Sequence, residues 1–112
     1  MRYLFRFGFE SPEEFKANRA GGWDDESSEA IWINAPSPED ALVWGCSVAD
    51  QLVRRLFEMA GVEGCSWLAG GFAHWIENEA AVLEWARASP EILEADFGRM
   101  PDLKEHAASR LR

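Results

Sequence analysis

Long hydrophobic runs are absent from this 112-residue sequence. No apolar segment approaches the roughly 20 residues that a membrane-spanning helix requires. Residues 1–10 carry Arg2, Arg6 and Glu10, and they contain no apolar region of the kind that signal peptides have. We therefore expect a cytoplasmic protein that has no membrane partner.

Cysteine and histidine are scarce, with two of each in the chain. Cys46 and Cys65 are too few for a disulfide framework, and both occupy apolar-patterned positions where a thiol acts as a small hydrophobic side chain. Cys46, Cys65 and His74 could act as soft metal ligands if folding brought them together, but their spacing is not that of a tight site. The acidic run 24–26 lacks the spaced oxygen ligands and central glycine of a calcium loop. We predict no metal and no cofactor.

Positive charge is the third scarce feature. The chain has 11 lysines and arginines but 20 aspartates and glutamates, which gives a net charge of −9. An acidic chain without clustered cations repels nucleic-acid phosphates, so we exclude direct nucleic-acid binding. Acidic residues are concentrated in residues 10–40, where Lys16 and Arg19 are the only cations. Such a surface suits a basic protein partner, since complementary potentials steer encounter, although acidity also serves solubility alone.

The most regular pattern that is present predicts an amphipathic helix from Ser37 to Gly61. Ser37 can cap the first turn, Pro38 fits the first helical position, and Gly61 supplies a left-handed stop. Apolar residues recur at three- and four-residue steps and form one stripe, which consists of Leu42, Cys46, Ala49, Leu52, Val53, Leu56 and Ala60. This helix is the element around which the rest of the fold is expected to assemble.

Three other segments have patterns that predict strands. Residues 2–9 alternate, with Tyr3, Phe5, Phe7 and Phe9 on one aromatic face, and residues 30–34 form a short β-branched run. Residues 65–76 are two short apolar runs around Gly70-Gly71, which is typical of a hairpin. In that hairpin Trp67 would lie opposite His74.

The remaining segments complete the expected order of elements. A short helical turn is expected at 11–18 and a second main helix at 78–88. Residues 91–97 carry conflicting signals, since Ser-Pro-Glu fits a helix start whereas the alternation of apolar and acidic residues fits a strand. We interpret this segment as a strand, and residues 98–112 as a short peripheral terminal helix.

Together these elements predict one α+β domain over residues 1–112. The order is that of a ferredoxin-like βαββαβ sandwich with an extra N-terminal strand. We expect an antiparallel sheet with the two main helices packed on one face, so that the opposite face is left uncovered.

Tryptophan is unusually abundant, with six residues beside seven phenylalanines. A chain of this length cannot easily bury six indoles, each of which needs a partner for its N–H group. Trp23 precedes Asp24, Asp25 and Glu26, and Trp44 lies about 60° around the helix from its apolar stripe. Because tryptophans beside carboxylates are favoured at interfaces, we predict that these five residues form an interaction surface.

No stretch of the sequence carries a specific catalytic motif, and we predict no catalytic residue. The leading hypothesis is a non-catalytic protein-interaction module, an inhibitor or immunity-type partner of a basic protein. One alternative is a homodimer that buries the open sheet face. Another is a small ligand-binding domain or enzyme with a pocket near Trp67 and His74. His74 could act as an acid or base near neutral pH, but stacking on Trp67 explains its position more simply.

Overall fold

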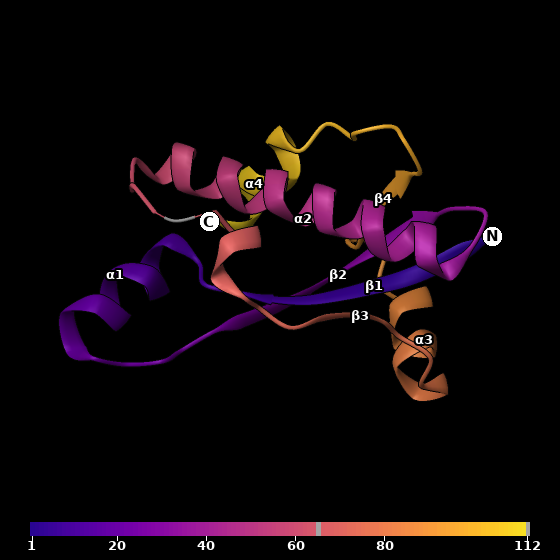
Figure 1. Cartoon of the computed structure of the whole chain (residues 1–112), viewed down its shortest axis with the longest axis horizontal. Helices are drawn as coiled ribbons and strands as arrows, with labels where there is room; N and C mark the ends of the chain where they lie inside the picture. The colour runs from indigo at the N-terminus through magenta and orange to yellow at the C-terminus, as the bar shows by residue number, and fades with distance from the viewer. Residues whose placement is uncertain (65, 112) are drawn as a thin grey trace.

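The computed structural model describes residues 1–64 and 66–111 (Figure 1). These residues form an α+β fold with a four-stranded mixed sheet and four α-helices. In chain order the elements are β1 (Arg2–Phe9), α1 (Pro12–Gly21), β2 (Ser27–Asn34), α2 (Pro38–Ala60), the 3-10 turn η1 (Leu68–Gly70), β3 (His74–Ile76), α3 (Ala80–Arg87), β4 (Leu93–Asp96) and α4 (Lys104–Arg110).

The sheet has the strand order β3-β1-β2-β4. Strand β1 pairs antiparallel with β2 on one side and with β3 on the other, whereas β4 lies parallel to β2. The sheet is therefore mixed rather than antiparallel, and its order departs from the predicted ferredoxin-like arrangement. The parallel pair is possible because the chain between β2 and β4 is long enough for a crossover. The segment 91–97 contains β4, so its interpretation as a strand is confirmed.

The predicted hairpin over residues 65–76 is wrong. Cys65 lies outside the described residues, and the segment after it contains η1, which ends at Gly71 with a positive φ of 69°. Strand β3 instead pairs with β1, where His74 lies opposite Phe7. The two glycines end a helical turn here, and the free edge of β1 supplies the partner that the first hairpin strand was expected to provide.

The larger core lies between α2 and the aromatic face of the sheet. The predicted helix is confirmed: the Asp40 N–H donates to Ser37 Oγ at 3.1 Å, and the helix stops at the left-handed Gly61. Phe5, Phe7, Ile31 and Ile33 are fully buried beneath α2. Gly45 allows the helix to approach the Phe5 ring so closely that an added Cβ would overlap it.

The prediction that both main helices cover one face of the sheet is wrong. Figure 1 shows α2 and α3 on opposite sides of the sheet. A second, smaller core holds Leu4, Trp32 and Ala86, with Leu83 packed against it. Along β1 and β2, Leu4 and Trp32 alternate with residues of the larger core such as Phe5 and Ile31. Their side chains therefore point away from α2 and are covered by α3. The uncovered face that the homodimer hypothesis requires is thus partly occupied.

The terminal helix α4 is packed rather than peripheral. Leu103 and Ala107 are buried in the larger core. The buried carboxylate of Glu29 in β2 accepts hydrogen bonds from Arg110 Nε at 2.8 Å and lies 2.6 Å from His106 Nε2. These contacts fasten the end of the described chain to β2. Among the described residues, no helix has the length and apolar character that crossing a membrane requires.

Candidate functional site

The predicted acidic surface lies on the loop between α1 and β2. The Trp23 side chain is 67% exposed, and Asp24, Asp25 and Glu26 are all exposed. Within the described part of the chain, none of these three carboxylates takes part in an ion pair. The loop therefore presents one large indole beside three uncompensated negative charges.

The backbone of this loop is held in place by Asn18, a buried residue near the end of α1. Its Nδ2 donates to the Asp25 carbonyl oxygen at 2.8 Å and to Glu10 Oε2 at 2.6 Å, and its Oδ1 accepts from the Asp25 N–H at 3.1 Å. The Trp23 ring lies so close to Gly21 that a larger residue there would displace it. Sequence patterns did not reveal Asn18, since its partners are mainly backbone atoms seven residues away.

The structure does not bring Trp44 together with this loop. Trp44 lies in the N-terminal third of α2, at the opposite end of the molecule from the α1–β2 connection (Figure 1). It is half-buried and packs edge-on against Phe97, with ring centroids 6.3 Å apart. Its Nε1 atom is buried and has no hydrogen-bond partner among the described residues. Any contact that Trp44 makes with a partner would be separate from one made by Trp23.

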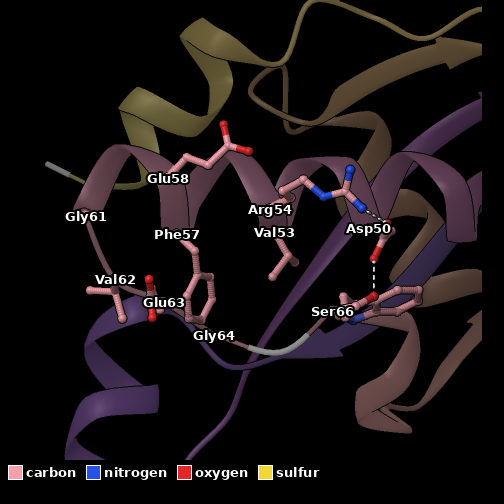
Figure 2. A pocket seen from close by; sticks show the side chains of 11 residues that line it. Asp50, Val53, Arg54, Phe57, Glu58, Gly61, Val62, Glu63, Gly64 and Ser66 are labelled. Carbon is pink, nitrogen blue, oxygen red and sulfur yellow. Dashed lines mark hydrogen bonds and ion pairs between the residues drawn. The ribbon is translucent and has the colours of Figure 1, made fainter.

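A cavity with a volume of about 690 Å³ lies between the C-terminal half of α2 and the segment after it (Figure 2). Val53 and Phe57 project from the same side of the helix, Val62 and Glu63 lie beside Phe57, and Trp67 adds to the apolar lining. Cavities of roughly 300–1,000 Å³ are typical of small-molecule sites in proteins.

Asp50 fastens the segment after α2 to the helix. Its Oδ1 accepts from Ser66 Oγ at 3.0 Å and from the Leu68 N–H at 3.3 Å, and its Oδ2 lies 3.3 Å from Arg54 (Figure 2). The carboxylate is buried, so these donors offset the cost of removing its charge from water. Asp50 lies outside the apolar stripe of the helix, and no sequence pattern indicated that η1 would cover it.

Trp67 and His74 are neighbours, but only Trp67 lines this cavity. Trp67 is buried, its Nε1 donates to the Gly8 carbonyl oxygen at 2.8 Å, and its ring centroid lies 5.5 Å from that of His74. The exposed His74 has its Nδ1 3.0 Å from the Phe72 carbonyl oxygen. Ser66 donates to Asp50 rather than to His74, so the described residues here do not form a nucleophile–base pair.

A second charged group lies on the α3 side of the sheet. Glu77 accepts hydrogen bonds from Trp75 Nε1 and from Arg6, each at 3.2 Å. The hydrogen bond from the Trp75 indole, with further help from the Arg6 charge, lowers the pKa of Glu77 below its ordinary value. This carboxylate is therefore held in its charged form.

Neither a search for metal-binding groups among the described residues nor comparisons with known proteins identified a further functional site. In the part of the chain that is described, no group of three or more histidine, cysteine or acidic side chains could hold a metal ion. Comparisons with known proteins gave no match, whether to a family model, a curated protein or a solved structure. Any function proposed for the chain therefore depends on its surfaces and cavities.

Proposed function

We propose that the chain is a non-catalytic interaction module that binds a basic protein through Trp23, Asp24, Asp25 and Glu26, in the manner of an inhibitor or immunity protein. The observation that carries the proposal is an exposed indole beside three carboxylates without ion-pair partners, on a backbone fixed by Asn18. Trp23 would serve as the apolar anchor of an interface, and the neighbouring carboxylates would supply its charge.

The two parts of the loop would contribute differently. The carboxylates and the net charge of −9 attract a cationic surface and raise the rate of encounter, and salt weakens that attraction. The Trp23 ring would supply the apolar contact that slows dissociation, since tryptophans are often dominant residues at interfaces. Because the hydrogen bonds of Asn18 already order the loop, binding would lose less conformational entropy than it would with a mobile loop.

The test has two stages. The immobilised chain is first used to capture candidate partners, and a captured basic protein is then purified and titrated by calorimetry. The test variant combines Asp24→Asn, Asp25→Asn and Glu26→Gln. The matched control removes three exposed carboxylates elsewhere through Glu84→Gln, Glu91→Gln and Glu105→Gln, and it changes the net charge by the same amount.

We expect the loop variant to raise the Kd of the purified basic partner by at least about tenfold, with the control within about twofold of the unmodified chain. Trp23→Ala should raise the Kd by a similar factor and mainly accelerate dissociation. Equal effects of the two charge variants would show that only overall charge matters and would remove the loop from the proposal. Failure to obtain any basic partner whose binding depends on the loop would refute the proposed function.

Ligand binding in the cavity of Figure 2 is a second candidate, and its volume of about 690 Å³ favours it. Phe57 and Trp67 offer aromatic surface, and Glu58 and Glu63 have no ion-pair partners among the described residues. This lining suits an amine with an apolar body. In a titration with 2-phenylethylamine, a saturable shift of the Trp67 indole resonance that 2-phenylethanol does not produce would support this role. No saturable shift would exclude this class of ligand.

A further inference from the structure

A separate cavity of about 640 Å³ lies on the α3 side of the sheet, where α3 meets β1 and the start of α2. Its apolar surface comes from Leu4, Trp32 and Leu83, which belong to the smaller core. The cavity shares no lining residue with the one in Figure 2. It is therefore a distinct site, and it reaches from α3 to the first residue of α2.

Two arginines border this cavity, although the chain as a whole is strongly acidic. The Arg2 guanidinium lies over the Trp32 ring, 4.0 Å from its centroid, and its NH1 contacts Glu94 at 3.1 Å. These contacts hold Arg2 in one place beside the apolar surface. Arg87 lies in the last turn of α3 and has no ion-pair partner among the described residues.

Glu77 is the one carboxylate among the described residues that line this cavity. Its oxygens already accept from Arg6, from the Trp75 indole and from the Glu79 N–H. The charge of Glu77 is thus compensated by Arg6, which does not line the cavity. Arg2 is likewise paired with Glu94, which lies outside the lining. The excess positive charge next to the buried apolar side chains therefore comes from Arg87.

We infer that this cavity binds a small amphipathic anion, namely a monocarboxylate with an apolar body. A guanidinium group presents paired N–H donors that match the two oxygens of a carboxylate. The head group would contact Arg87 and the exposed side of Arg2, and the apolar body would cover Leu4, Trp32 and Leu83. This inference does not depend on the proposed protein partner, because the loop of Trp23 does not line the cavity.

The probe is octanoate, titrated below its micelle-forming concentration and followed by the assigned indole N–H resonance of Trp32. Octan-1-ol serves as the neutral analogue of similar length. Arg87→Gln removes the unpaired guanidinium from an exposed helix end, and Arg87→Lys keeps the charge but loses the paired donors. Arg55→Gln, on the exposed side of α2 and outside the cavity, is the matched control.

We expect a saturable shift of the Trp32 resonance with octanoate and weaker binding of octanol. Arg87→Gln should raise the Kd for octanoate about tenfold, since a hydrogen bond to a charged group is lost, and Arg87→Lys should have an intermediate effect. Arg55→Gln should stay within about twofold of the unmodified chain. The inference is overturned if octanol binds as tightly as octanoate, if Arg87→Gln binds octanoate unchanged, or if no saturable shift occurs. An unchanged thermal midpoint for Arg87→Gln would establish that the fold is intact.

Discussion

Replacing Gly45 with alanine tests how closely α2 approaches the sheet. Gly45 is a buried position in α2 that lies against the ring of Phe5 in β1. A Cβ atom there would lie 2.8 Å from Phe5 Cδ1 and closer still to Cγ and Cδ2. Non-bonded carbon atoms normally remain about 3.5–4.0 Å apart, so the ring or the helix would have to move.

Two opposing effects determine how much Gly45→Ala changes the free energy of unfolding. In a helix interior, alanine is favoured over glycine by about 1 kcal/mol. Overpacking of a filled core costs about 1–3 kcal/mol, and we take the upper value because Phe5 and Leu52 are both fully buried in the larger core. The expected net loss is about 2 kcal/mol of unfolding free energy. With an unfolding entropy of about 2.1 cal/mol/K per residue, this loss lowers the Tm of the 112-residue chain by about 8 °C.

Urea unfolding measures the change in unfolding free energy, and calorimetry measures the change in Tm. Ser47→Ala, on the same helix, serves as a control that is expected to change stability by less than about 0.5 kcal/mol. In a Phe5→Leu background, Gly45→Ala should lose most of its cost, because the ring that it would strike is gone. A Gly45→Ala variant that is more stable by about 1 kcal/mol would refute the close approach and the helix–sheet packing deduced from it.

Three further predictions concern ionisable groups. Glu29→Gln should lower the unfolding free energy by about 1–3 kcal/mol and accelerate hydrogen exchange in α4, since Arg110 loses its charged acceptor; an unchanged urea midpoint would contradict this. The Trp75 indole holds the pKa of Glu77 below its ordinary 4.5, so Glu77 stabilises the fold above that value and this contribution is lost as the pH falls through the lowered pKa. Urea midpoints measured between pH 3 and 6 should therefore decline less steeply in Glu77→Gln, and parallel profiles would count against the contact. Burial raises the pKa of the Cys46 thiol, so iodoacetamide should alkylate it more slowly at pH 8 in the native chain than in urea. Peptide mass spectrometry provides the rates, and equal rates would show that Cys46 is accessible.

The elements that could be predicted from the sequence are those whose signals are local. The Ser37 cap, the apolar stripe and the Gly61 stop all lie within α2 or directly beside it, and the alternation in β1 is independent of its partners. The exposed acidic loop likewise follows from its own composition. Such segments carry enough information in neighbouring residues to define their type and approximate bounds.

The parts that could not be predicted depend on distant residues. Gly70-Gly71 fits a hairpin turn, but the partner of β3 is β1, about 70 positions earlier in the chain. The apolar residues Leu4 and Trp32 were visible in the sequence, yet nothing in the periodicity of α3 specified which face of the sheet it would cover. Asn18 and Asp50 bind loop backbone groups, and a polar residue inside a helix gives no indication of such partners.

The attachment of α4 to β2 has a consequence for folding during synthesis. Arg110 reaches Glu29 across 81 positions of sequence, and β4 comes to lie along β2 only after most of the chain has been made. Until these segments have been made, the sheet has an open edge at β2 and the Glu29 carboxylate lacks its partner Arg110. Since contacts so distant in sequence slow folding, the final structure would be reached only after residues 93–110 have emerged.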